Sequence, residues 1–343
     1  MKNMVITDGF AFVEFVSPEP ANLVDLFERF GFRVAGRSKH GMVMMTQGTA
    51  AFVINGNPNA FRTRHGASVR AIAIRVDDAH RAQQQALAGG ARVALPETEG
   101  AFVVDTPAIL SIGDSLVYFV DSDFRTLFDL PVETRPGPAG DACIVAVDHT
   151  SNIVHPDNLD RWADFYRDTF GFDERQYLEV KGRQTGMRAR SMVSPCGRVS
   201  IPVAAAAHDQ PGVLNQNDEF IRDYGGEGIQ HIALLSADID ATIDQLARAG
   251  IAFMAAPSRH YYAGIDARLP GHGLDLERLA ARGILVDGKG PQQVLLQRFT
   301  RRQIGPVFFE IIERRGEDGF GEGNFKALFE SQEQDQQERG TRR

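Results

Sequence analysis

The chain repeats itself, and a duplicated unit constrains the architecture more strongly than any single motif. Residues 22–32 (NLVDLFERFGF) and 158–172 (NLDRWADFYRDTFGF) share an Asn that can cap a helix, an amphipathic run and a Gly that ends it. Residues 69–93 and 229–253 form a second pair, in which a strand leads through an Asp into a helix of period 3.6 that ends at Gly. Two copies of two such units predict four modules of strand and helix.

Short helices that alternate with several short strands and Gly-rich turns predict an α+β fold, with helices on one side of curved, mainly antiparallel or mixed sheets. Residues 133–141 (ETRPGPAGD) are rich in Pro and Gly and lack an apolar period, as a linker does. We therefore expect one domain over residues 1–135 and a second over residues 136–343. The tail after residue 326 begins as an amphipathic helix and continues as polar sequence.

Composition and charge exclude several classes of protein. The net charge is −8, and basic residues form only the Arg pairs at 301–302, 314–315 and 342–343, which argues against a nucleic-acid-binding surface. The N-terminus lacks the apolar core of a signal peptide, and nowhere do 18 uncharged apolar residues run together. We expect a cytoplasmic protein without membrane contact. Cys143 and Cys196 are far apart and outside any CxxC spacing, so neither a disulfide framework nor a zinc knuckle is indicated.

Residues 305–316 (GPVFFEIIERRG) place Glu310 in the middle of what reads as a buried strand. An ionised carboxylate left unpaired in such a place would cost several kcal/mol or take up a proton. Something must therefore compensate it. The alternatives are an ion pair with an arginine such as Arg314, a strand whose second face is wet, or a metal ion.

Comparison of the two halves singles out three possible metal ligands. His149, His231 and Glu310 all lie in strand contexts of the second half, and the first half has no ligand at the matching positions. Two imidazoles and one carboxylate suit an open Fe(II) site, and zinc accepts the same set. Each His alone is better explained as an ordinary hydrogen-bonded histidine, but the three together favour a metal. Aligned with the first half, the three residues fall close to Glu14, opposite Ala71 and roughly opposite Phe119, respectively.

Five segments carry a resemblance to known proteins, namely VDHTSN (147–152), EGIQHIALL (227–235), RGILVDG (282–288), GPVFFEIIERRG (305–316) and GFGEGNFKALFE (319–330). They resemble the 4-hydroxyphenylpyruvate dioxygenase family, a two-domain member of the vicinal-oxygen-chelate (glyoxalase-like) superfamily. The resemblance covers nearly the whole chain. It implies two glyoxalase-like domains, each of paired βαβββ modules forming an open barrel-like curved sheet, plus a C-terminal lid helix. It also implies that His149, His231 and Glu310 hold Fe(II), so that only the C-terminal domain binds metal.

The resemblance further implies which residues surround the substrate. Strand periodicity agrees in part, because Phe308 shares a face with Glu310 and Phe299 shares one with Gln297. Without the resemblance, the C-terminal Phe residues are equally well explained by core packing, and a single Gln by a surface or strand position. The implied catalytic residues are Gln230, Gln297, Phe308 and Asn324. The implied substrate contacts are Ala189, Ala204, Gln216, Gln230, Gln297, Phe299, Phe308, Phe320 and Phe325, of which Phe320 and Phe325 close over the site together with Asn324.

Two positions depart from the family pattern. Ala189, within GMRARS, stands where the family has Ser, and Ala204, within IPVAAAA, stands where it has Asn. Each lost hydrogen bond removes on the order of 1 kcal/mol if no water replaces it. The substituent on the substrate ring therefore stays open.

The implied substrates are an aromatic 2-oxo acid and O₂. The implied reaction converts 4-hydroxyphenylpyruvate and O₂ into homogentisate and CO₂, a step of tyrosine catabolism, with migration of the side chain on the ring. A close alternative is a 4-hydroxymandelate synthase, which oxidises the benzylic carbon. Phe308 favours attack on the ring, and Ala204 weakens that preference. Two further alternatives are a dioxygenase for another arylpyruvate and a metal-free glyoxalase-like binding protein. The resemblance also implies a homodimer or homotetramer.

Overall fold

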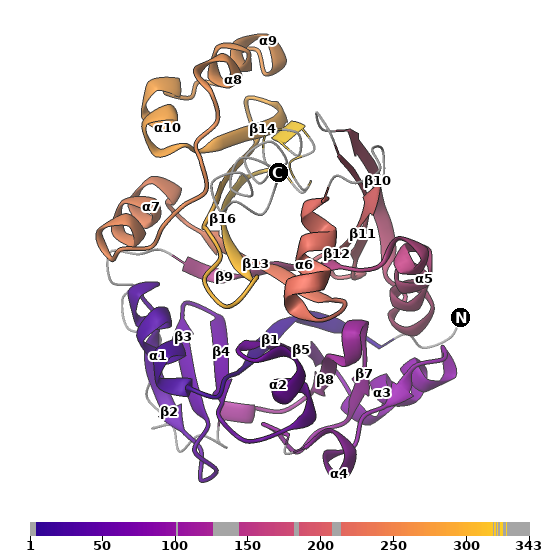
Figure 1. Cartoon of the computed structure of the whole chain (residues 1–343). Helices are drawn as coiled ribbons and strands as arrows, with labels where there is room; N and C mark the ends of the chain where they lie inside the picture. The colour runs from indigo at the N-terminus through magenta and orange to yellow at the C-terminus, as the bar shows by residue number, and fades with distance from the viewer. Residues whose placement is uncertain are drawn as a thin grey trace.

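Two eight-stranded mixed sheets with the same strand order carry the two halves of the chain (Figure 1). The computed structural model describes residues 5–100, 102–125, 144–181, 185–207, 214–317, 319, 321, 323, 324 and 327. The first sheet has the order β2-β3-β4-β1-β5-β8-β7-β6, and the second has the order β10-β11-β12-β9-β13-β16-β15-β14. The predicted α+β duplication is therefore confirmed.

Each sheet is built from two βαβββ modules. In the first half, β1 pairs in parallel with β4, β5 pairs in parallel with β8, and the antiparallel pair β1 and β5 joins the two modules. The elements of this half are β1 (Thr7–Val16), α1 (Pro20–Arg29), β2 (Arg33–Arg37), β3 (Val43–Gln47), β4 (Ala50–Asn55), α2 (Ala60–His65), β5 (Ser68–Val76), α3 (Ala79–Ala88), β6 (Arg92–Val93), α4 (Pro96–Glu99), β7 (Ala108–Leu110), the 3₁₀ turn η1 (Ile112–Asp114) and β8 (Leu116–Val120).

The second half repeats this plan and has three short helices, α8 to α10, between α7 and β14. The first half has one short helix, α4, between β6 and β7, so this part of the second half is larger. Its elements are β9 (Ile144–Ile153), the 3₁₀ turn η3 (Pro156–Asn158), α5 (Leu159–Phe170), β10 (Asp173–Lys181), β11 (Gly186–Val193), β12 (Ser200–Ala207), α6 (Gln216–Tyr224), β13 (Gly228–Ser236), α7 (Ile239–Arg248), α8 (Arg259–Ala263), α9 (Ile265–Arg268), α10 (Leu276–Arg282), β14 (Leu285–Gly290), β15 (Gln293–Phe299) and β16 (Phe308–Arg315).

Phe309 of β16 packs into the core of the first half. Its ring centroid lies 4.8 Å from that of Phe30 and 6.0 Å from that of Phe27, and the ring is fully buried. Because successive side chains of a strand point to opposite faces, Glu310 must point away from this shared core. The contact between the halves thus fixes which face of β16 carries the carboxylate.

The residues expected to cap the helices form side-chain cap bonds in α3 and α7 but not in α1 and α5. Asp78 and Asp238 cap α3 and α7, where their carboxylates accept the backbone N–H of Arg81 and Ala241. Of the two expected Asn caps, Asn22 is wrong, and Asn158 has the cap position without a side-chain cap bond. Helix α1 begins at Pro20, whose fixed φ suits a first helical position, and thus already includes Asn22. Asn158 stands at the cap of α5 but donates its amide to the Glu227 carboxylate instead.

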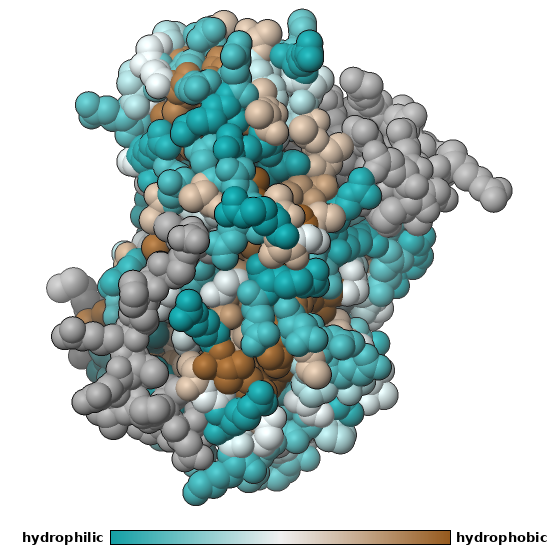
Figure 2. Space-filling model, turned by 90° about the vertical axis from the view of Figure 1, so that its left-hand side faces the viewer, coloured by the Kyte–Doolittle hydropathy of each residue, from teal (hydrophilic) through white to brown (hydrophobic). Residues whose placement is uncertain are grey.

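On the face shown in Figure 2, hydrophilic residues predominate and hydrophobic ones gather in patches, one of them on the lower half. Within the described ranges, no helix is both long and apolar enough to cross a bilayer. The expected boundary between residues 135 and 136, Cys143 and most of the expected C-terminal lid helix, including Phe320 and Phe325, lie outside the described residues.

Candidate metal centre

The three predicted ligands come from three neighbouring strands at the centre of the second sheet. Ala233 of β13 pairs with His149 of β9 on one side and with Glu310 of β16 on the other. His231 stands two residues before Ala233 and therefore shares its face. Residues separated by about 80 positions in the sequence thus converge because β9, β13 and β16 are hydrogen-bonded neighbours.

The ligand atoms lie close enough to share one ion. His149 Nε2 is 3.2 Å from Glu310 Oε2, His231 Nε2 is 3.6 Å from the same oxygen, and one ligand atom from each residue lies within 4.8 Å of the others. Ligands bonded at about 2.1 Å around one ion are roughly 3 to 3.5 Å apart. Glu310 is 1% exposed. The spacing and burial fit a bound divalent metal.

The same positions of the first sheet carry no ligand set. Ala73 of β5, the counterpart of Ala233, pairs with Phe12 and Tyr118. The counterpart of Glu310 is therefore Tyr118 and not its neighbour Phe119, whose side chain faces the other way. Ala71 matches His231 as expected, since both stand two residues earlier on their strands. Glu14 is two residues from Phe12, so it only neighbours the position of His149.

A buried ion pair fills this part of the first sheet. Glu14 Oε1 accepts hydrogen bonds from Asn55 Nδ2 at 2.8 Å and Arg70 Nη1 at 3.2 Å, and the Tyr118 hydroxyl donates to Oε2 at 3.2 Å. All four side chains are at most 1% exposed. Burial raises the pKa of Glu14, and the Arg70 charge opposes this. Among the described residues, only the second half holds a cluster of potential metal ligands.

Asp148 orients His149. Its Oδ1 lies 2.8 Å from His149 Nδ1, and Arg314 binds the same carboxylate through Nε at 2.7 Å and Nη2 at 2.8 Å. Burial would raise the pKa of Asp148, but the Arg314 hydrogen bonds and charge hold it well below its usual value. A carboxylate on the remote nitrogen of a ligating His fixes its ring orientation and tautomer. Arg314 therefore pairs with Asp148, and the ion pair considered for Glu310 does not form.

Glu310 is instead compensated by the two imidazoles and by Gln297. Gln297 Nε2 donates to Glu310 Oε1 at 2.8 Å. Without a metal, burial lowers the pKa of His149, but the charge of Glu310 and the contact with Asp148 together raise it to about 9. Burial and then the His149 charge hold the pKa of His231 well below its usual value, so its imidazole is neutral.

Aromatic rings hold His231 in place. Phe308 stacks on its imidazole at 4.9 Å with an interplanar angle of 23°, and Phe299 meets it edge-on at 6.4 Å. Phe308 thus supports the His231 ring and is not among the cavity-lining residues, whereas Phe299 is. His231 Nδ1 is buried and has no hydrogen-bond partner among the described residues.

A cavity opens beside the three ligands. Ala189 and Ala204, the two departures from the family pattern, are paired across β11 and β12 and form one apolar patch of its wall. Gln216 is not among the lining residues, but the next residue of α6, Asn217, is. The lining consists of His149, Ser151, Ile153, Met187, Ala189, Pro202, Ala204, Asn217, Gln230, His231, Gln297, Phe299, Glu310, Gly321 and Asn324.

Six lining residues were not predicted from the sequence, namely Ser151, Ile153, Met187, Pro202, Asn217 and Gly321. Ser151 and Ile153 follow His149 at intervals of two on β9, so strand period alone would have found them. Met187 and Pro202 required the pairing of β11 with β12. No local sequence pattern shows that Asn217, and not Gln216, lines the cavity. The orientation of α6 determines which of the two side chains faces it.

Comparisons with known proteins agree with this geometry. Residues 1–132 match the family model "Hydroxyphenylpyruvate dioxygenase, HPPD, N-terminal", and residues 146–271 match the model of the glyoxalase, bleomycin resistance protein and dioxygenase superfamily. A 4-hydroxyphenylpyruvate dioxygenase from Legionella pneumophila is 40% identical over 97% of this chain and 96% of its own. One from Pseudomonas sp. is 39% identical over 97% of this chain and 96% of its own.

A third relative and two solved structures complete the picture. The protein named hemolysin VllY from Vibrio vulnificus is 41% identical over 98% of this chain and 97% of its own. A mutant 4-hydroxymandelate synthase from Streptomyces coelicolor has the same fold, with a TM-score of 0.79 at 22% identity over 96% of this chain and 99% of that one. A fusion of a xylose isomerase-like barrel with a 4-hydroxyphenylpyruvate dioxygenase also gives a TM-score of 0.79, at 26% identity over 97% of this chain and 53% of the fusion.

Proposed function

The chain belongs to the 4-hydroxyphenylpyruvate dioxygenase family, and from this premise we propose that it converts 4-hydroxyphenylpyruvate and O₂ into homogentisate and CO₂. The observation that carries the proposal is the convergence of His149, His231 and Glu310 beside a cavity. Full-length relatives at about 40% identity support the activity.

His149, His231 and Glu310 would hold Fe(II). Two neutral nitrogens and one carboxylate oxygen are the ligand set of non-haem Fe(II) oxygenases, and they leave positions for a substrate and O₂. When bound, the ion supplies orientation of the 2-oxo acid and electron transfer to O₂. His149 must lose its proton before it can ligate, and Asp148 then holds the remaining N–H at Nδ1.

The cavity wall would hold the rest of the substrate. Gln230, Gln297 and Asn324 supply polar contacts, and Phe299 supplies an aromatic edge. Phe308 acts through the ring of His231. The roles expected for Gln216, Phe320 and Phe325 remain predictions.

Oxygen consumption and product analysis test this proposal. The purified protein, loaded anaerobically with Fe(II), should consume one O₂ for each 4-hydroxyphenylpyruvate and yield homogentisate. His231→Ala should bind no Fe(II) and consume none. 4-Hydroxymandelate as the main product would refute ring attack, and a parent protein that binds no iron would refute the enzyme altogether.

A second candidate is a dioxygenase for an arylpyruvate without the 4-hydroxyl. The paired methyl groups of Ala189 and Ala204 favour it, because they offer no hydrogen bond at that part of the wall. The double variant Ala189→Ser with Ala204→Asn restores the polar groups of the family. It should shift kcat/KM toward 4-hydroxyphenylpyruvate over phenylpyruvate if this wall faces the ring. An unchanged ratio of the two kcat/KM values would show that Ala189 and Ala204 do not determine which substrate is preferred.

We also retain a cytoplasmic homodimer or homotetramer as the expected state. Light scattering of the purified protein would give its mass, to be compared with 37.7 kDa for one chain. Fractionation of the producing cells would give its compartment.

A further inference from the structure

A chain of hydrogen bonds leads from Glu310 out to helix α8. Gln297 Nε2 donates to Glu310 Oε1 at 2.8 Å, Asn324 Nδ2 donates to Gln297 Oε1 at 2.8 Å, and the Tyr261 hydroxyl donates to Asn324 Oδ1 at 2.5 Å. The backbone N–H of Val286 in turn donates to the Tyr261 oxygen at 2.7 Å. Five groups from β16, β15, the C-terminal segment, α8 and β14 thus form one series.

The bonds of this series all run in one direction, which suits the acceptor at its inner end and the donor at its outer end. An ionised carboxylate only accepts, so Gln297 must present its NH₂ group to Glu310 and its carbonyl oxygen to Asn324. Asn324 must then also present its NH₂ group inward, which leaves its carbonyl oxygen facing Tyr261. Only a donor can satisfy that oxygen. Burial raises the pKa of Tyr261, so the phenol keeps the proton that it donates.

We propose that Tyr261 is a positioning residue for the metal centre, which holds Asn324 and Gln297 in the one amide orientation that lets Gln297 donate to Glu310. This rests on the proposed metal site. An amide group has nearly the same shape in its two orientations, so packing alone selects poorly between them. With the phenol removed, either amide can turn over. If the Gln297 amide turned over, its carbonyl oxygen would face the Glu310 carboxylate and repel it. The carboxylate would then be less well oriented toward the metal.

Tyr261 itself is held through its ring and its hydroxyl. The Arg268 guanidinium lies over its ring at 5.1 Å. Its hydroxyl also lies 3.0 Å from the Val286 carbonyl oxygen. Gly323, the neighbour of Asn324, is held on the same side, because its backbone N–H donates to Asp287 Oδ2 at 2.8 Å.

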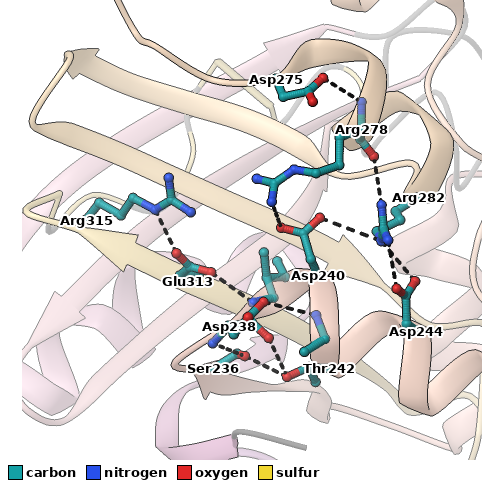
Figure 3. A network of polar contacts seen from close by, with 12 residues as sticks. Ser236, Asp238, Asp240, Thr242, Asp244, Asp275, Arg278, Arg282, Glu313 and Arg315 are labelled. Carbon is teal, nitrogen blue, oxygen red and sulfur yellow. Dashed lines mark hydrogen bonds and ion pairs between the residues drawn. The ribbon is translucent and has the colours of Figure 1, made fainter.

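Ion pairs and one hydrogen bond connect α10, through α7, to the strand that carries Glu310 (Figure 3). Arg282 of α10 binds Asp244 of α7 at 2.7 Å, and Arg278 binds Asp240 at 3.2 Å. The backbone N–H of Ile239, at the start of α7, donates to Glu313 of β16 at 2.8 Å. Helix α10 is therefore tied to β16, and it also contacts α8, which carries Tyr261.

The test compares Tyr261→Phe with Tyr262→Phe. The neighbouring Tyr262 is also buried on α8, but its hydroxyl donates to the Ile284 carbonyl oxygen at 3.0 Å, outside the series. Each variant loses one hydroxyl from the same helix. Anaerobic competition with a chromogenic chelator gives the Fe(II) dissociation constant, and the visible spectrum of Co(II) in the site reports ligand geometry.

Tyr261→Phe should raise the metal dissociation constant at least about tenfold and alter the Co(II) spectrum, because loss of a partner behind a ligand commonly costs 10- to 100-fold. Tyr262→Phe should stay within about twofold of the parent. Asn324→Ala should weaken binding to a similar degree, and adding Tyr261→Phe to it should change nothing further. It also serves as the test if Tyr261→Phe does not fold.

The proposal is overturned if Tyr261→Phe and Tyr262→Phe have the same metal dissociation constant. It is also overturned if the increases in dissociation constant caused by Tyr261→Phe and Asn324→Ala multiply in the double variant. A parent protein without metal affinity would instead refute the proposed function, so the two failures are distinguishable.

Discussion

The ion pair between Asp148 and Arg314 gives a sharp prediction. It stabilises the second half, and its carboxylate also orients the His149 ring. Asp148→Asn keeps the shape of the side chain and removes its charge. Arg314 then loses two charge-assisted bonds, at 2.7 and 2.8 Å, and keeps a guanidinium that is 19% exposed. Breaking a buried pair from one side costs about 3–5 kcal/mol, and partial exposure places this site at the lower end, near 3 kcal/mol.

Urea unfolding of the metal-free protein measures this loss. The pKa of Asp148 lies well below its usual value in the folded protein, so its contribution is complete above the unfolded pKa of about 4 and is lost only as the pH falls below that. The part of the difference that comes from the Asp148 charge should therefore be constant above pH 5. Asp148 also helps to raise the pKa of His149 to about 9, so the part of the difference that His149 carries should shrink as the pH rises toward 9. The Fe(II) dissociation constant should also rise by about 10- to 100-fold, because Asn holds the His149 ring less well.

Arg314→Met and the double variant complete the cycle. Arg314 also donates to the carbonyl oxygens of Glu317 and, at 2.6 Å, of Gly319, so Arg314→Met loses these bonds besides the pair. In the double variant no charge is left uncompensated, so the two losses should be less than additive by about 1.5–3 kcal/mol. A stability loss below about 1 kcal/mol for Asp148→Asn, with unchanged metal affinity, would refute the reasoning.

Two further predictions concern the metal-free protein and the first half. Because the pKa of His149 is about 9 without metal, metal binding at pH 7.5 should release close to one proton, and the apparent affinity should rise about tenfold for each pH unit up to about pH 9. Titration of Zn(II) into weakly buffered protein with a pH indicator measures this, and release of no proton would contradict it. Arg70→Met should destabilise the first half by about 3–5 kcal/mol, since it strands the buried Glu14, and should leave metal affinity unchanged. Denaturant unfolding measures the loss of stability, and the chelator assay measures the metal affinity. Weakened metal binding would show that the first half of the chain influences the metal centre in the second.

The sequence predicted the duplication, and it singled out three residues that the structure brings together, because both depend on patterns that repeat. Strand period and the Asp caps placed the second pair of modules, and the missing ligands of the first half pointed to His149, His231 and Glu310. The alignment of the halves was one residue off at Glu310, because a strand offers two registers that differ only in the face of each side chain. The pairing of β5 with β8 shows that Tyr118 is the counterpart of Glu310.

What the sequence did not predict depends on contacts between distant segments. Arg314 lies four residues from Glu310 and was the natural candidate to neutralise it, but on a strand that spacing does not bring two side chains into contact. It pairs with Asp148, 166 positions earlier in the chain. Tyr261 lies within a stretch with no metal-binding pattern at all, and only the packing of α8 on β14 brings its hydroxyl to Asn324.

The burial of Phe309 among the aromatic rings of the first half has a practical consequence for anyone who divides the molecule. A fragment that begins at residue 144 would retain His149, His231 and Glu310 but expose this ring and its neighbourhood to water. Such an exposed apolar face promotes self-association. We therefore expect the isolated second half to aggregate, so the two halves have to be produced together.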